Sequence, residues 1–172
     1  MKVFKRDQKI PDAYVASTAF SLGKMLAEQG DIKGARAAFQ QALDSKDPQY
    51  APEAGYTLGM LLTKHDDIDG AREAYRLTAN LGLSEYSAMA ARNLGHIYKR
   101  QHRYRQACTA YELAIDSRHP DVAPWAMVYL ANVLREFIDP AAARANYQRA
   151  IASGHPEAAK AAAERLAAFE NK

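Results

Sequence analysis

The sequence is short of the residues that build several common kinds of protein. It holds one cysteine, Cys108, in 172 residues, so it offers neither a disulfide framework nor a cysteine-based metal site. A lone cysteine favours a reducing compartment, and we expect a cytoplasmic protein. No apolar run approaches the roughly 18–20 residues that a membrane-spanning helix needs, so no membrane contact is expected. The basic stretch 1–6 is not followed by an apolar segment, so we expect no secretory signal.

Motifs that carry catalysis are also missing. There is no glycine-rich phosphate loop and no nucleophile elbow. The five histidines form no His-Glu-x-x-His pair, and we expect them to be ordinary residues of turns and helices. Arg103 and Arg105 lie near Cys108 in the sequence, which leaves the reactivity of this thiol open. We therefore predict a protein that is not an enzyme, with no catalytic residues, no metal and no cofactor.

The positive charge is concentrated at the N-terminus. The formal net charge is +3, and the first eleven residues alone account for it, because four cations there face a single carboxylate. We interpret residues 1–11 as a basic, flexible arm, with an electrostatic arm for an anionic partner as the alternative. The rest of the chain is nearly neutral, which argues against a nucleic-acid-binding body.

The chain has abundant alanine and little valine or isoleucine, which favours helix over sheet. Its main feature is a pair of residues that recurs every 36 positions. A fixed period of this length indicates an array of helical repeats. The pair reads Leu22-Gly23, Leu58-Gly59, Leu94-Gly95 and Leu130-Ala131.

Each pair is followed at fixed spacing by an alanine, an aromatic residue and a second small residue. Apolar residues fall three and four positions apart on both sides of a turn, so each unit predicts two helices. The aromatic residues are Phe39, Tyr75, Tyr111 and Tyr147. We predict one domain over residues 12–172, with units at about 12–47, 48–83, 84–119 and 120–155 and a capping helix at 156–170.

This pattern resembles the tetratricopeptide repeat, whose helix-turn-helix unit carries Leu-Gly in its first helix and Ala, an aromatic and Ala in its second. The resemblance implies an all-α, right-handed α-solenoid. Two departures are a period of 36 residues and the replacement of an early aromatic by Ala19, Gly55, Ala91 and Met127. A glycine in mid-helix costs roughly 1 kcal/mol, so we expect another backbone to lie close to Gly23, Gly59 and Gly95.

The same resemblance implies that the first helices line a concave groove that binds a peptide segment of another protein. Trp125 is the first choice for an interaction hot spot, and packing of its ring against the neighbouring unit is the alternative. Only fragments of the family's clamp for an acidic chaperone tail are present. The predicted groove residues are Phe20, Lys24, Tyr56, Met60, Lys64, Met89, Arg92, His96, Lys99, Arg100, Trp125, Val128, Asn132 and Arg135.

The turn of the third unit, 99–105, differs from the other three turns in charge. It carries a basic patch of Arg100, Arg103 and Arg105, whereas the equivalent turns carry aspartates. A solvated surface is one interpretation of this patch.

Three functions therefore stay open. The first is a non-enzymatic protein-interaction module whose partner is a protein or peptide, and an acidic segment in that partner is one option. The second is a self-associating scaffold that pairs the basic turn with acidic turns. The third is an RNA-binding or regulatory protein that uses the arm and the basic turn.

Overall fold

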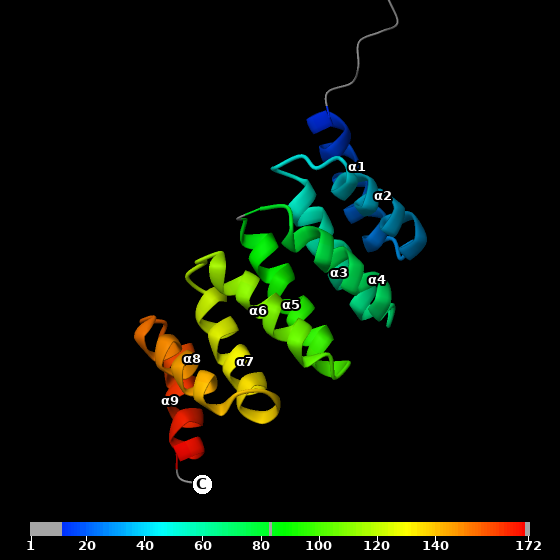
Figure 1. Ribbon diagram of the computed structural model, residues 1–172. Coiled ribbons are helices and arrows are strands. Elements are labelled where there is room, and N and C mark those ends of the chain that lie inside the picture. Colours follow the sequence, from blue (N-terminus) through cyan, green and yellow to red (C-terminus); the bar gives the residue numbers. More distant parts are fainter. Residues whose placement is uncertain (1–11, 83, 171–172) are drawn as a thin grey trace, which may run out of the picture.

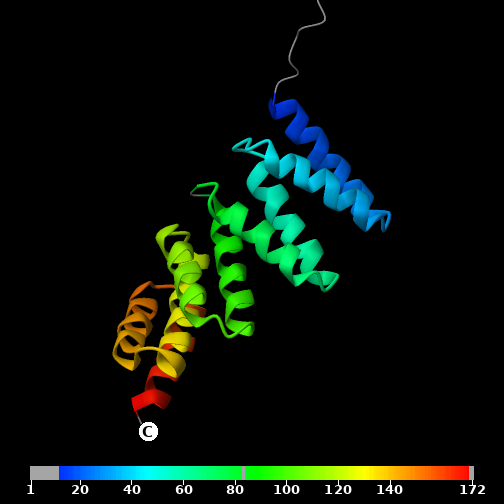
Figure 2. The ribbon, with the colours of Figure 1, turned by 45° about the vertical axis from the view of Figure 1, so that its right-hand side comes forward.

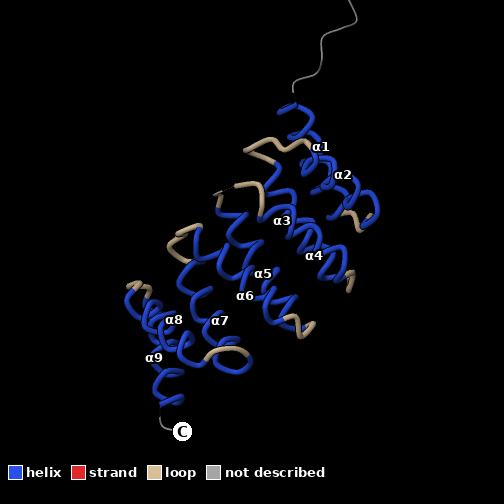
Figure 3. Tube along the Cα trace, viewed as in Figure 1, coloured by secondary structure: helices blue, strands red, loops and turns tan. Residues whose placement is uncertain are grey.

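The computed structural model describes residues 12–82 and 84–170, so the predicted basic arm lies outside the described residues (Figures 1 and 3). Within those ranges the chain forms helices and no strand, as predicted. The helices are α1 (Asp12–Glu28), α2 (Ile32–Asp44), α3 (Ala51–Lys64), α4 (Ile68–Ala79), α5 (Glu85–Arg100), α6 (Tyr104–Asp116), α7 (Val122–Phe137), α8 (Pro140–Ala152) and α9 (Pro156–Glu170).

The helices stack as hairpins in the order of the sequence, from α1 and α2 at one end to α8 and α9 at the other (Figures 1 and 2). Each first helix packs against the second helix of its own unit and against that of the preceding unit. Contacts also join α3 to α5, α5 to α7 and α7 to α9. The first helices therefore follow one another along one side of the stack, and the predicted α-solenoid is confirmed.

Local capping decides where the second helices begin. The carboxylate oxygen of Asp31 accepts the backbone N–H of Gly34 at 2.9 Å, and Asp67 does the same for Gly70 at 2.8 Å. Asp139 caps α8 in the same way. Such caps satisfy backbone donors that lack partners in the first turn of a helix. The second helix of the third unit, α6, starts at Tyr104, and the side chain of its N-cap residue Arg103 makes no capping hydrogen bond.

The contact between the two helices of each unit, called here the seam, differs from the prediction in one respect. A methyl group added at Gly95 would lie 2.5 Å from a ring carbon of Tyr111, and one at Gly59 would lie 2.4 Å from Tyr75. The neighbour that requires glycine is thus an aromatic ring of the same unit, and the expectation of a second backbone is wrong. Sequence spacing identified the close approach but not the group that makes it.

The last helix of the described residues, α9, packs at the end of the stack opposite α1. It contacts α7 and α8, and its Ala158 and Ala162 are buried against them. Its exposed positions are charged or small, as in Glu157, Lys160 and Glu164. No helix in the part of the chain that the structure describes has the length and apolar character needed to cross a membrane.

The seam gives a first test of the fold. Tyr111 is fully buried, so Tyr111→Ala removes its ring contacts and leaves a cavity. We expect the free energy of unfolding, measured with urea, to fall by about 3 kcal/mol or more. The control is Leu113→Ala two residues away, because Leu113 is 41% exposed. Equal losses for the two variants would show that the aromatic seam does not hold the units together.

Candidate functional site

The side chains predicted for the groove all lie on first helices, namely α1, α3, α5 and α7. Because successive first helices contact one another from α3 onward, these side chains share one side of the stack, called here the inner side. The structure divides them into residues of the core, residues bonded within their own unit, and residues that leave a free group at the surface.

Phe20 and Val128 belong to the core, which corrects two of the predicted groove positions. Phe20 is buried, with its ring 5.9 Å from that of Phe39 and 6.3 Å from that of Tyr50. Val128 is fully buried in a cluster that includes Ala158 of α9. Both positions came from repeat phase alone, and phase does not reveal that the segment starting the next unit covers them.

His96 and Asn132 are bonded within their own units. The Tyr111 hydroxyl lies 2.9 Å from Nδ1 of His96, and the Tyr147 hydroxyl donates to Asn132 Oδ1 at 2.6 Å. Burial lowers the pKa of His96 to about 4, and the neighbouring cations Arg92 and Lys99 act in the same direction. At neutral pH the imidazole is therefore uncharged, so it offers a partner hydrogen bonds and not a positive charge.

A hollow of about 220 Å³ opens between α3 and α5 beside His96. Burial raises the pKa of Tyr75 in this hollow, while hydrogen bonding by Asn93 and Thr63 acts against the rise. The phenol is therefore neutral and presents a polar group next to apolar walls. The lining residues are Thr63, Tyr75, Asn93, His96, Ile97 and Arg100.

Cations without ion pairs surround this hollow. Within residues 12–82 and 84–170 the side chains of Arg92, Lys99 and Arg100 form no ion pair, and the same holds for Lys24 and Lys64. Arg135, by contrast, binds Glu136 at 2.9 Å. Most carboxylates that pair with arginine lie at second helices, as in Asp67 with Arg36, Asp69 with Arg72 and Glu73 with Arg76. The cations of α5 that lie near His96 are thus not paired with a carboxylate of the described residues.

The predicted aromatic anchors are partly packed. The ring of Trp125 stacks on Tyr129 at 5.9 Å and meets His155 edge-on at 6.3 Å, which agrees with packing against the neighbouring segment. Tyr56 lies 6.0 Å from Tyr75 and 5.8 Å from Tyr86. The side chains of Trp125, Tyr56 and Met89 are partly exposed, and that of Met60 is 44% exposed.

The basic turn of the third unit forms a separate hollow of about 440 Å³. Its wall includes Tyr104 and Phe137, whose rings stack at 3.8 Å. Arg103 lies over the ring of Tyr98 and binds Gln106, while Arg100 and Arg105 extend from the turn without an ion pair among the described residues. The hollow is lined by His102, Arg103, Tyr104, Arg105, Gln106, Phe137 and Ile138.

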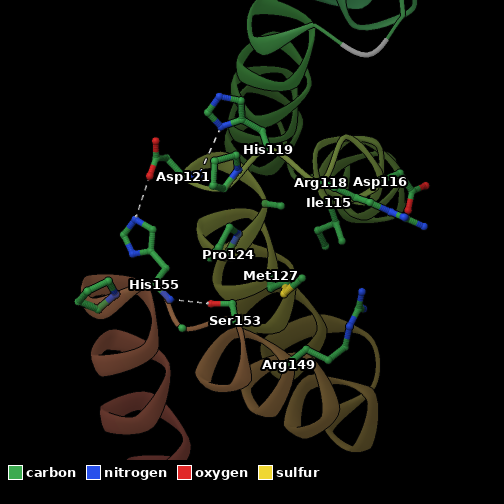
Figure 4. Close-up of a pocket in the computed structure, with 14 residues that line it drawn as sticks. Ile115, Asp116, Arg118, His119, Asp121, Pro124, Met127, Arg149, Ser153 and His155 are labelled. Atoms are coloured by element: carbon green, nitrogen blue, oxygen red, sulfur yellow. Dashed lines mark hydrogen bonds and ion pairs between the residues drawn. The ribbon is translucent and has the colours of Figure 1, made fainter.

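Another hollow, of about 620 Å³, lies between the links that follow α6 and α8, and sequence reasoning missed it (Figure 4). His119 Nδ1 accepts the backbone N–H of Val122 at 3.4 Å, and His155 Nδ1 accepts that of Ala158 at 3.2 Å. Each histidine therefore caps a helix, and its other nitrogen faces a carboxylate, Glu85 at 3.9 Å and Asp121 at 3.7 Å. The repeat spacing of the two histidines was the available signal.

The remaining candidate groups give no sign of catalysis in the described ranges. Cys108 is buried, and burial raises the pKa of its thiol, which disfavours the reactive thiolate. No group of three or more His, Cys, Asp or Glu side chains in residues 12–82 and 84–170 is placed to hold a metal ion.

The comparison with protein families decides the relationship of this chain. The sequence profile of the family described as "Tetratricopeptide repeat-like domain" matches residues 13–135. The chain belongs to the tetratricopeptide repeat-like family. Domains of this family are generally protein-interaction modules and typically non-enzymatic. A comparison with curated proteins found no match.

Solved structures of low sequence identity share the fold of this tetratricopeptide-repeat chain. PilF of Pseudomonas aeruginosa is 20% identical with a TM-score of 0.63, over 94% of this chain and 72% of that one. A MamA protein is 18% identical with a TM-score of 0.63, over 92% and 90%. BtubC (BKLC) of P. vanneervenii is 16% identical with a TM-score of 0.60, over 94% and 83%. At these identities the likeness concerns the fold.

The depressed pKa of His96 predicts a pH dependence of stability. Its value is about 4 in the folded chain, against 6.5 for the unperturbed side chain. The unfolded chain therefore takes up a proton first as the pH falls, so the stability that neutral His96 supplies is present above about pH 6.5 and is lost towards pH 4. We expect urea denaturation to show a loss of up to about 3 kcal/mol across this window.

The matched variant His96→Gln should lose this part of the pH dependence. His65→Gln serves as the control, because His65 is an exposed residue next to the turn of the second unit. A His96→Gln curve that parallels the wild-type curve from pH 7 to pH 4 would contradict the assignment.

Proposed function

We propose that this tetratricopeptide-repeat protein binds an acidic peptide segment of another protein along the inner side of α3, α5 and α7. The observation that carries the proposal is the group of unpaired cations, Arg92, Lys99 and Arg100, around the hollow beside His96. A cation without an intramolecular partner loses no ion pair when it binds a carboxylate of a ligand.

The size of this hollow favours a peptide over a small-molecule cofactor. Its volume of about 220 Å³ lies below the range of about 300–1,000 Å³ that is usual for pockets of small ligands. It accommodates one side chain, and the hydroxyl of Tyr75 and the imidazole of His96 give that side chain hydrogen-bonding groups. Both groups are neutral at pH 7, so they add specificity without adding charge.

Apolar contacts on either side of the hollow complete the surface. Met60 on α3 is 44% exposed, and partly open surfaces of Tyr56, Met89 and Trp125 continue along the same side. Aromatic and methionine side chains are common anchors at protein interfaces. Because these residues sit on packed helices, little conformational entropy is lost on their side of the interface.

The structure favours the two alternative functions less. Self-association through opposite turns needs carboxylates without a cation partner, and Asp67 of the second unit already pairs with Arg36 at 2.6 Å. An RNA-binding function would rest on the single basic turn around Arg103 and Arg105, since its second element, the arm, lies outside the described residues. The inner side offers a longer continuous surface than that turn, so we retain the peptide-binding function.

A binding experiment with selected peptides tests the proposal. Acidic and basic sets of random peptides would be displayed against the wild-type chain, and the affinity of the best binders would be measured by fluorescence anisotropy. We expect binders from the acidic set only. Arg92→Glu and Arg100→Glu should each weaken binding at least about tenfold, because each removes a charge-assisted hydrogen bond and adds repulsion.

The control variants carry the same charge change elsewhere. Lys33→Glu on α2 and Lys160→Glu on α9 alter exposed residues outside the inner side, so they should leave the affinity unchanged. Circular dichroism would verify that all four variants keep their helices. If all four variants weakened binding equally, the loss of affinity would result from net charge alone. If Arg92→Glu and Arg100→Glu left the affinity unchanged, the inner side would not be the binding site.

A further inference from the structure

The basic turn between α5 and α6 departs from the repeat in a way that costs a hydrogen bond. Its residue Arg103 stands where the other three units have Asp31, Asp67 and Asp139. Each of these aspartates accepts backbone N–H groups in the first turn of the following helix, whereas Arg103 makes no capping hydrogen bond. A missing cap weakens the start of a helix. The α6 helix therefore lacks a stabilising contact that α2, α4 and α8 all have.

The same residue also removes an ion pair between neighbouring units. Asp67 binds Arg36 of the preceding unit at 2.6 Å. At the next boundary the corresponding residues are Arg72 and Arg103, which carry like charges, and Arg72 pairs within its own helix instead. The guanidinium of Arg103 binds the neutral side chain of Gln106. A departure that costs stability without an ion pair in return among the described residues is typical of a functional surface.

The surface beside this turn combines positive charge with apolar groups. Its hollow of about 440 Å³ lies between the turn and the end of α7, and no carboxylate of the described residues lines it. The side chain of Arg105 is exposed and forms no ion pair in residues 12–82 and 84–170. Phe137 and Ile138 are 46% and 44% exposed, and the ring of Phe137 lies parallel to that of Tyr104 at 3.8 Å. A ligand at this surface meets cations and an apolar face together.

Charge decides between the occupants of this surface. Residues 1–11 carry four cations and one carboxylate, so like charge disfavours them as the occupant. In a two-fold pairing of turns, Arg103 and Arg105 would face their own copies, so a second chain would need a different surface. A nucleic acid favours a continuous basic surface, but outside residues 1–11 the chain is nearly neutral. An acidic segment of another protein, with an apolar residue among its carboxylates, matches both the charge and the apolar face.

We propose that the basic turn docks an acidic segment of another protein, whose carboxylates bind Arg103 and Arg105 and whose apolar side chain packs on Phe137. Carboxylates form charge-assisted hydrogen bonds with arginine, and an exposed ring is a suitable anchor for a second apolar group. The hollow at the turn shares no lining residue with the hollow beside His96. The inference is therefore independent of peptide binding on the inner side, and either can hold without the other.

The first test measures the stability of the chain and needs no ligand. Arg103→Asp introduces the residue type of the other turns, so it should regain the cap and give Arg72 an ion-pair partner. We expect the midpoint of thermal unfolding, followed by circular dichroism, to rise by about 2–4 °C. The matched control is Arg103→Ala, which removes the same cation but supplies no capping oxygen, so it should not raise the midpoint. A midpoint that Arg103→Asp fails to raise would overturn the proposal, because the arginine would then cost the chain nothing.

The second test measures the binding of two fluorescent peptides by anisotropy. One peptide is a run of glutamates with a central phenylalanine, and the other has alanine at that place. The chains carry Arg92→Glu, so that the inner side does not contribute. We expect the phenylalanine peptide to bind about tenfold more tightly than the alanine peptide, because its ring packs on Phe137.

Two further changes assign this binding to the turn. Arg105→Glu should weaken the binding of both peptides at least about tenfold, because it removes a charge-assisted hydrogen bond and adds repulsion. Phe137→Ala should abolish the difference between the two peptides. The matched control is Leu113→Ala, which alters an apolar residue of similar exposure on α6 and should preserve that difference.

Other results would overturn the proposal. A chain that binds neither peptide, or whose affinities Arg105→Glu and Phe137→Ala leave unchanged, does not dock an acidic segment at the turn. Tighter binding of an oligouridylate than of both peptides would assign the turn to nucleic acid. A molar mass that rises with concentration in the wild-type chain but not in Arg105→Glu, measured by light scattering, would assign the turn to a second copy.

Discussion

The contact between an aromatic ring of each second helix and a small residue of the first helix supports the rest of this structure. The rings of Phe39, Tyr75, Tyr111 and Tyr147 are buried, and at Gly59 and Gly95 even a methyl group would overlap them. A close-packed seam of this kind fixes the relative position of the two helices in a unit. Repetition of the same seam sets the first helices side by side and so creates the inner side.

One position next to the seam varies from unit to unit, and this variation decides which inner-side residues are free. In the third and fourth units the tyrosine hydroxyl binds His96 or Asn132, fifteen residues earlier. The second unit has Met60 at that place, and the hydroxyl of Tyr75 is hydrogen-bonded by Asn93 and Thr63 instead. In the first unit the ring is Phe39, which has no hydroxyl, and the matching residue is Lys24. The free groups at this position therefore lie in the first two units, and the bonded ones in the last two.

Charge is also divided between the two kinds of helix. Arginines 36, 72 and 76 on second helices have carboxylate partners, whereas the cations around the hollow beside His96 have none among the described residues. Exposed ion pairs contribute little to stability, so this division has a small effect on folding. The side chains of Arg92, Lys99 and Arg100 therefore stay unpaired among the described residues, and the proposed binding of an acidic peptide rests on this feature.

The sequence by itself determined the fold class: the 36-residue period, the Leu-Gly pairs and the aromatic positions predicted an all-α solenoid of paired helices, because apolar spacing and turn residues are local properties of the chain. The groove on the first helices stays a prediction, which the resemblance to the tetratricopeptide repeat implied. Only the tertiary structure decided that Val128 is covered by α9, that the hydroxyl of Tyr111 is hydrogen-bonded to His96, and that His119 and His155 cap helices around the hollow of about 620 Å³. These properties depend on which side chain of the same or of a neighbouring unit lies next to a given position in the folded chain. The repeat spacing does not contain that information.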